Sequence, residues 1–304
     1  MELDNSWGIS TDLTNLAALY EARSQYDLAL SLYGKSLAIS EKNEDKEAVL
    51  RNLTGIGIVW IWRGLYPLAL EYETRSLSLA RELLNRKGAS AALINIGLIY
   101  DRQADYPKAL ENYRQALEIY REIGDRRGEG SALNNIGLIY GNQRNYPKAL
   151  ESHAQALLIR REIGDRPGEG STLNNIGIIY QRQSDYPKAL ENYRQALEIY
   201  REIGDRPGEG NTLNNFGLLY RRQKNYSTAL EYFRQALAIR RQIANNRLIV
   251  DTLRNIVLTH IDMRQETKAI ELLEEPLTLA RETQDPQLQS LTALSVKLKQ
   301  RPTQ

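Results

Sequence analysis

The seven residues "NNIGIIY" at positions 174–180 carry the pattern on which the fold depends. Two asparagines are unusual at the head of an apolar run, because the Asn amide competes for backbone hydrogen bonds and makes Asn a mediocre helix former. The arrangement returns as NNIGLIY at 134–140 and as NNFGLLY at 214–220, with a weaker copy, INIGLIY, at 94–100. The sequence therefore places an amide at the same point of a unit that recurs every 40 residues.

The composition describes an ordinary folded protein that dissolves in water. The chain has 304 residues, of which 42% are hydrophobic and 26% are charged. A net charge of +2, from 40 basic and 38 acidic side chains, gives no electrostatic case for a nucleic-acid partner. Cysteine is absent, which excludes disulfides, a thiolate metal site and a Cys nucleophile. The start, MELDNSWGIS, is no signal peptide and no long apolar stretch follows, so we expect a cytoplasmic protein without membrane insertion.

The motif marks an internal repeat. Segments aligned on it begin at 14, 54, 94, 134, 174, 214 and 254, and residues 106–126 are identical to residues 186–206, which indicates duplication. We predict a single repeat domain over residues 1–304. Its units cover about 10–44, 50–84, 90–124, 130–164, 170–204, 210–244 and 250–284, and a capping helix follows over about 286–300.

Each unit predicts two helices. In the fourth unit, Leu133, Ile136 and Tyr140 lie on one helical face, and the chain breaks at 145–146. Pro147 suits the first turn of the second helix, and Gly164 is expected to end that helix in a left-handed conformation. The connectors GDRRGEG, GDRPGEG and GDRPGEG, which begin at 124, 164 and 204, are expected to lead into the next first helix.

A glycine in the middle of each first helix predicts close packing between the two helices of a unit. Gly137 costs roughly 1 kcal/mol relative to alanine at such a position. That cost is tolerable if the second helix approaches closely, and we expect Ala149 to be the small residue that faces it.

The pattern Leu-x-x-Ile-Gly-x-x-Tyr, followed by Ala149, His153 and Ala156, resembles the tetratricopeptide repeat. The forty-residue unit is longer than the usual one of roughly 34 residues and is similar to the long-helix repeats of kinesin light chains and Pins-type adaptors. The GDRxGEG connector resembles arrays in cyanobacteria and other bacteria. The resemblance covers about residues 9–284. It implies an all-α, right-handed superhelical solenoid of seven helix-turn-helix units, whose concave groove binds peptides.

The resemblance also implies which residues line that groove. They fall on a separate stripe of the first helices, and the predicted peptide-binding residues are Asn95, Asn135, Asn175, Asn215 and Asn255 in one column, Asn134, Asn174 and Asn214 in a second, Arg102, Asn142, Arg182 and Arg222 one turn later, and Leu138, Ile178 and Trp62 as apolar contacts.

The residue types suit an extended peptide. An Asn amide can donate to a peptide carbonyl and accept from a peptide N–H, and arginines alongside favour Asp, Glu or a terminal carboxylate in the ligand. The alternative is that the amides bond to each other or to nearby backbone and specify how the repeats stack. Trp62 likewise either anchors a hydrophobic ligand side chain or packs under the N-terminal repeat.

No group of residues predicts catalysis. His153 and His260 fill positions that are aromatic in other units, so they are interpreted as packing residues and not as metal ligands. No nucleophile, base and orienting residue stand out, and we expect no enzyme, no cofactor and no metal. The sequence predicts a scaffold or adaptor that binds an extended segment of a partner protein. A peptide-sensing regulatory module, as in bacterial peptide-pheromone receptors, and a homo-oligomeric assembly protein remain as alternatives.

Overall fold

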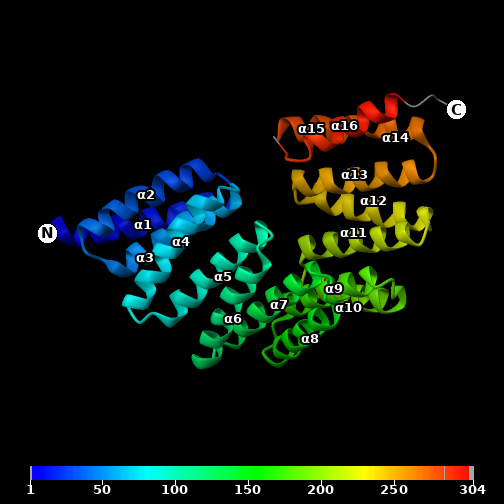
Figure 1. The fold of residues 1–304 in the computed structure, drawn as a ribbon. Coiled ribbons are helices and arrows are strands. Elements are labelled where there is room, and N and C mark those ends of the chain that lie inside the picture. Colours follow the sequence, from blue (N-terminus) through cyan, green and yellow to red (C-terminus); the bar gives the residue numbers. More distant parts are fainter. Residues whose placement is uncertain (1, 284, 301–304) are drawn as a thin grey trace. The chain divides into compact units, whose positions relative to one another are not determined.

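A computed structural model describes residues 2–283 and 285–300 as helices joined by short turns, and contains no strand within those ranges (Figure 1). The chain divides into two compact units, residues 1–159 and 160–304. The predicted all-α architecture of consecutive helix-turn-helix pairs is confirmed. The single domain over 1–304 stays a prediction.

The helices are close to uniform in length. In the first unit they are α1 (Glu2–Ala22), α2 (Tyr26–Lys42), α3 (Lys46–Trp62), α4 (Tyr66–Glu82), α5 (Arg86–Arg102), α6 (Tyr106–Glu122) and α7 (Arg126–Asn142). The unit boundary falls inside α8 (Tyr146–Glu162). The second unit continues with α9 (Arg166–Arg182), α10 (Tyr186–Glu202), α11 (Arg206–Arg222), α12 (Tyr226–Gln242), α13 (Asn246–Asp262), α14 (Glu266–Leu272), α15 (Glu274–Glu282) and α16 (Leu288–Lys299).

The turns between helices share one left-handed residue. Gly164 has φ of +66°, which confirms the predicted left-handed cap, and the equivalent Gly124 and Gly204 have φ of +71° and +70°. Leu84 adopts the same conformation without being glycine, with φ of +53°. Pro147 lies in the first turn of α8 as predicted, where a missing N–H costs nothing.

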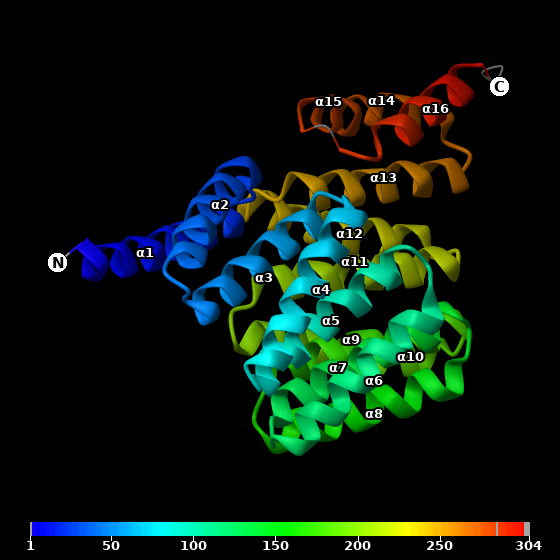
Figure 2. The same ribbon diagram turned by 60° about the vertical axis from the view of Figure 1, so that its left-hand side comes forward.

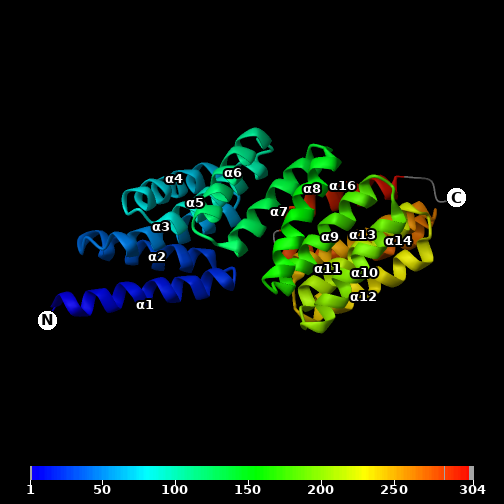
Figure 3. The ribbon, with the colours of Figure 1, turned by 90° about the horizontal axis from the view of Figure 1, so that it is seen from below.

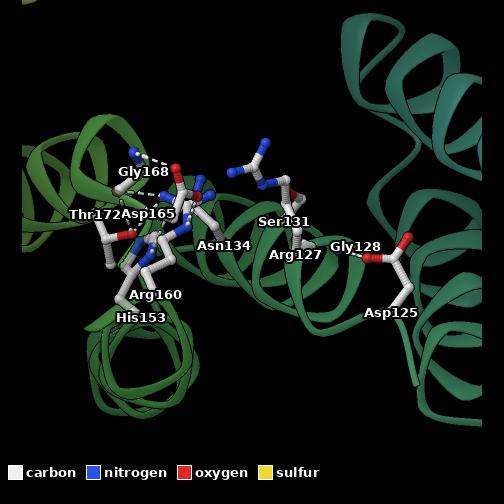
Figure 4. Close-up of polar contacts among 10 residues, drawn as sticks. All are labelled: Asp125, Arg127, Gly128, Ser131, Asn134, His153, Arg160, Asp165, Gly168 and Thr172. Atoms are coloured by element: carbon white, nitrogen blue, oxygen red, sulfur yellow. Dashed lines mark hydrogen bonds and ion pairs between the residues drawn. The ribbon is translucent and has the colours of Figure 1, made fainter. Parts of the chain in front are cut away.

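The connectors are shorter than the sequence analysis assumed. Helix α7 already begins at Arg126, so only residues 124 and 125 of GDRRGEG lie outside the helices. The Asp125 carboxylate accepts a hydrogen bond of 2.8 Å from the backbone N–H of Gly128 and thereby caps the helix (Figure 4). Asp165 and Asp205 cap α9 and α11 in the same way.

The mid-helix glycine of a first helix faces the side chain of a ring position on the second helix, not the alanine that we expected. A Cβ built on Gly217 would lie 2.5 Å from the ring of Phe233, and one built on Gly97 would lie 2.6 Å from the ring of Tyr113. Both rings are buried on the second helix of their own repeat. The prediction that Ala149 opposes Gly137 is therefore wrong, because the position next to Gly137 is taken by the imidazole of His153.

The last repeat departs from the others because Pro276 interrupts its second helix. Proline lacks an N–H and crowds the carbonyl four residues earlier, here that of Leu272, so the helix divides at Leu273. Helix α16 covers this repeat through Leu291 and Leu298, which are 0% and 2% exposed.

Within each unit the pairs lie in layers. In the second unit α11, α12 and α13 lie side by side (Figure 2), and in the first unit α1 forms the outer edge next to α2 (Figure 3). This stacking aligns equivalent positions of successive first helices, and the candidate site lies along those positions.

Candidate functional site

In the second unit, asparagines of successive repeats bond to one another. The amide N–H of Asn215 on α11 donates to the Oδ1 atom of Asn174 on α9 over 3.0 Å. Asn255 on α13 donates to Asn214 on α11 over 3.1 Å. We call these two bonds the Asn ladder. The two predicted columns are therefore joined, and the ladder fixes the direction in which the outer amides, Asn215 and Asn255, point.

In the first unit, the corresponding amides meet side chains of second helices. Asn95 on α5 donates to the Oε1 atom of Glu73 on α4 over 2.9 Å. Asn134 on α7 lies 3.1 Å, Oδ1 to Nδ1, from His153 on α8 (Figure 4). Glu73 and His153 are both 0% exposed and hold the position that Tyr113 fills with a ring.

Burial changes the chemistry of Glu73. Desolvation raises the pKa of its carboxyl well above the ordinary value of 4.5, and the hydrogen bond from Asn95 opposes the shift only in part. Its Oε2 atom is buried without a hydrogen-bond partner. A neutral carboxylic acid therefore suits this position better than a carboxylate.

One predicted outer asparagine has no acceptor at the ladder position. Asn135 is half-buried on α7, and the position that would supply its ladder acceptor is Ile94, which has no polar side chain. Asn175 is half-buried on α9.

One turn later along the first helices, the predicted residues are exposed. Trp62 at the end of α3 is 55% exposed, so it does not pack beneath the preceding repeat. Arg102 and Asn142 are exposed in the first unit, and Arg182 and Arg222 are exposed in the second. We call these residues the exposed row. The predicted apolar contacts Leu138 and Ile178 lie between the asparagines and the exposed row. They are less exposed than Trp62, since Leu138 is 37% exposed and Ile178 is half-buried.

The charges of the exposed row have acidic neighbours. Burial raises the pKa of Asp101, while the positive charge of Arg102 and a hydrogen bond from Asn142 lower it. In the second unit, Arg221 next to Arg222 forms an ion pair of 2.7 Å with Asp262. Acidic groups thus lie beside Arg102 and beside Arg221, the neighbour of Arg222.

Buried carboxylates that were not predicted from the sequence lie at the junctions between repeats. Glu169 is 6% exposed and accepts from Arg161 over 2.8 Å and from Arg166 over 2.7 Å. Burial alone would raise the pKa of Glu169, but the bonds from the two arginines lower it overall. Glu129 is held by Arg121 and Arg126 in the same manner. The GEG segments are therefore structural, and the Asp cap before them was the signal that could have placed them on a helix.

A buried arginine occupies the core of the second unit at two equivalent positions. Arg160 donates to the Thr172 hydroxyl over 2.6 Å and to the carbonyl of Gly168 (Figure 4). Arg240 donates to the carbonyl of Leu248 over 2.9 Å and to Asn211 over 3.0 Å. Burial lowers the pKa of Arg240 to about 10. The terminal nitrogens of both groups are bound in the core, while the Nε atoms of Arg160 and Arg240 are buried without a hydrogen-bond partner.

The described ranges contain no group of three or more His, Cys, Asp or Glu residues that could hold a metal ion. Of the helices in residues 2–283 and 285–300, none is long and apolar enough to cross a membrane.

Comparison with known proteins identifies the repeat. The model of the tetratricopeptide repeat family matches residues 9–82, 61–122, 129–202 and 171–242. No curated protein matches the sequence.

Several solved structures have a similar fold. The apo form of RapI is 19% identical and has a TM-score of 0.67, with 88% of this chain and 99% of that chain covered. The apo form of the quorum sensor NprR from B. thuringiensis is 17% identical, with a TM-score of 0.62 and coverage of 99% and 84%. A Rap protein in complex with competence and sporulation factor is 13% identical, with a TM-score of 0.62 and coverage of 98% and 96%.

Proposed function

We propose, on the premise that this chain belongs to the tetratricopeptide repeat family, that it binds an extended segment of a partner protein along its first helices. The observation that carries the proposal is the exposed row. Trp62, Arg102 and Asn142 in the first unit, and Arg182 and Arg222 in the second, are exposed at the same register of their helices. Large or charged side chains repeated at one exposed register suit a ligand that runs across the repeats of either unit.

The Asn ladder supports backbone capture. Asn215 uses one amide N–H in its bond to Asn174, and an amide carries two N–H donors and an oxygen that accepts. A second donor and the oxygen are therefore available to a peptide backbone that lies alongside. Because the ladder orients the amide in advance, less side-chain freedom is lost when the ligand binds. The stacking role and the binding role of these asparagines are compatible.

The residues of the exposed row set the preference for ligand side chains. Arg182 and Arg222 offer planar guanidinium groups, which bind carboxylates through paired hydrogen bonds. We infer a preference for Asp, Glu or a terminal carboxylate at the second unit. At the first unit the indole of Trp62 offers an open apolar surface, which favours a hydrophobic or aromatic ligand side chain.

A second candidate function is peptide sensing, in which the bound peptide regulates another activity. It is favoured by the likeness of the fold to the quorum sensor NprR and to a Rap protein in complex with competence and sporulation factor. In this case the ligand is a short free peptide and not a segment of a folded partner.

A displayed library of short random peptides tests the proposal. Selection on the wild-type protein should enrich peptides that contain Asp, Glu or a free carboxyl end. The variant Arg182→Ala/Arg222→Ala should lose roughly tenfold or more in affinity for the enriched acidic peptides. The matched control is Arg194→Ala/Arg234→Ala, which removes two exposed arginines from the second helices α10 and α12 and should change nothing.

The other outcomes are also informative. Equal loss in both double variants would mean that general positive charge, and not the exposed row, attracts the peptides. Enrichment of no peptide would contradict the proposed function. Binding of short free peptides that changes the conformation of the protein, measured by near-UV circular dichroism, would favour the sensing candidate over the scaffold.

A further inference from the structure

Helix α1 has an exposed apolar stripe that none of the other first helices has. Ile9, Leu16 and Leu19 are 44%, 41% and 59% exposed, and Asp12 and Arg23 are exposed beside them. The five positions are spaced alternately by three and four residues, so the four within α1 lie on one narrow face of the helix. Arg23 is the first residue after α1, and its backbone N–H still donates to the carbonyl of Leu19 over 3.2 Å. We call this face the α1 stripe. Apolar residues at this spacing are typical of a helix face that packs along another helix.

The equivalent positions are buried in the other repeats. At the position of Leu16 the exposed fractions are small: Ile56 4%, Ile96 5%, Ile136 5%, Ile176 8%, Phe216 2% and Ile256 8%. The position of Leu19 is equally closed, with Val59 0%, Ile99 0%, Ile139 0%, Ile179 3%, Leu219 0% and Thr259 0%.

The second helix of the preceding repeat supplies the cover at those positions. In one core cluster, Leu110 and Leu117 of α6 pack with Ile136 and Ile139 of α7. Helix α1 instead packs against α2 and α3 and lies at the outer edge of its unit (Figure 3). Within the described residues of the first unit, no second helix covers the α1 stripe.

The two ends of the repeat array differ in this respect. At the C-terminal end, α16 covers the last repeat with Leu291 and Leu298, which are fully buried or nearly so. The second-helix surface of the last repeat is therefore already occupied. A head-to-tail contact between two copies would need that surface, so it does not provide the cover for the α1 stripe.

The charges of the α1 stripe are complementary to those of a second, reversed copy. Asp12 lies four residues before Leu16, and Arg23 lies four residues after Leu19. When two such helices pack antiparallel about a two-fold axis, Leu16 of one opposes Leu19 of the other, and Asp12 opposes Arg23 at both ends. A parallel arrangement would set Asp12 against Asp12. Neither charge has an ion-pair partner among the described residues.

We propose that two copies of this chain associate through their α1 stripes as an antiparallel, two-fold symmetric dimer. The leucines form the apolar centre, and the two Asp12–Arg23 pairs fix the orientation and the register. The inference is independent of the proposed peptide binding, because it uses a face of α1 that contains no residue of the exposed row.

The mass of the full chain in solution tests the dimer. Light scattering over a series of protein concentrations should give twice the chain mass for the wild type. Leu16→Glu/Leu19→Glu should give the single-chain mass throughout, since it sets four carboxylates into the apolar centre. The matched control is Leu158→Glu on α8, because Leu158 is 59% exposed like Leu19 but lies outside the α1 stripe. It should remain dimeric.

A charge exchange tests the orientation. Asp12→Arg and Arg23→Asp should each weaken the dimer by roughly tenfold, because each sets like charges against each other. The double variant Asp12→Arg/Arg23→Asp should restore the wild-type association, and an equimolar mixture of the two single variants should form a heterodimer. Circular dichroism should show unchanged helix content, since the altered side chains are exposed.

Three results would overturn the inference. The first is a wild-type protein with the single-chain mass at every concentration, which would leave the α1 stripe to another occupant. The second is a dimer that survives Leu16→Glu/Leu19→Glu. The third is a dimer that the double charge variant fails to restore, which would exclude the antiparallel register.

Discussion

Some of the first-helix amides have different kinds of partner in the two units of the molecule. In the second unit an aromatic ring fills the space beside each first-helix glycine, as Phe233 does, and the amides pair with each other, as Asn255 does with Asn214. In the first unit, two of the ring positions hold Glu73 and His153, and the amides of Asn95 and Asn134 contact these polar side chains. The side chain at the ring position of the second helix thus decides whether a first-helix amide has a polar partner there.

The physical reason is the cost of an unsatisfied polar group. A buried carboxyl or imidazole without a hydrogen bond costs about 1–3 kcal/mol, so the nearest amide is drawn to it. A phenyl ring makes no such demand, and the amide is free to bond along the array. This difference can be tested by moving the polar and apolar ring positions between the units.

The largest effect is expected when the arrangement of the first unit is copied into the second. Phe233→Glu removes a fully buried ring and buries a carboxyl group in its place. We expect a loss of about 4 kcal/mol or more in the free energy of unfolding of the second unit. Urea denaturation followed by circular dichroism measures the loss.

The control for this change keeps the ring. Phe233→Tyr installs the side chain that Tyr193 presents at the equivalent position, and it should cost less than about 1 kcal/mol. Equal losses of stability in Phe233→Glu and Phe233→Tyr would show that this position tolerates no substitution. The loss in Phe233→Glu could then not be attributed to the polarity of the carboxyl group.

Substitution of Glu73 is expected to raise the free energy of unfolding at neutral pH, by less than Phe233→Glu lowers it. Its raised pKa means that the folded state favours the protonated carboxyl, so its contribution to stability is fully present below pH 4.5 and is lost as the pH rises toward the raised value. Glu73→Gln keeps an oxygen for Asn95 and has no charge to bury. The variant should match the wild type near pH 4 and exceed it by roughly 1–3 kcal/mol at neutral pH.

Melting temperatures between pH 4 and pH 8 measure this trend. Glu71→Gln is the control, because Glu71 lies on the same helix and is exposed, and its difference from the wild type should stay constant with pH. A difference at Glu73 that also stays constant would contradict the buried neutral acid.

The smallest effect concerns the Asn ladder itself. Asn174→Ala removes the acceptor of the Asn215 amide and should cost about 1 kcal/mol in stability. Asn135→Ala should cost less than about 0.5 kcal/mol. The residue of α5 at the acceptor position of the ladder is Ile94, which cannot accept a hydrogen bond from the Asn135 side chain. Thermal denaturation of the two variants, side by side, checks the difference; equal costs would remove the ladder as a stabilising feature.

Much of the fold could be predicted from local patterns. Prolines in first turns, left-handed glycines and the apolar face around Ile136 are each determined by a few neighbouring residues, and the structure agrees with them. The start of α7 was misplaced because RRGEG is rich in glycine, which usually indicates a loop. Gly128 is there for another reason, since a Cβ on it would lie 2.3 Å from the ring of Tyr120.

The contacts of the candidate site could not be predicted in the same way. That Asn95 bonds to Glu73 and Asn215 bonds to Asn174 depends on packing between helices of different repeats, which no single repeat contains. Nor does the spacing of residues reveal that Glu73 takes a ring position, unless the second helices are aligned with the same care as the first. The exposure of Trp62 likewise follows from its neighbours in space.

The junctions between repeats have a consequence for how such a gene changes. Glu129 and Glu209 are each clasped by two arginines, one before and one after the turn, in the same geometry. Because residues 106–126 and 186–206 are identical, recombination between the two coding segments joins a helix to a follower that already carries the matching clasp. Whole repeats can therefore be gained or lost at this point while the contacts between Glu and the two arginines are kept at the new junction. The number of repeats can change without any change in these contacts.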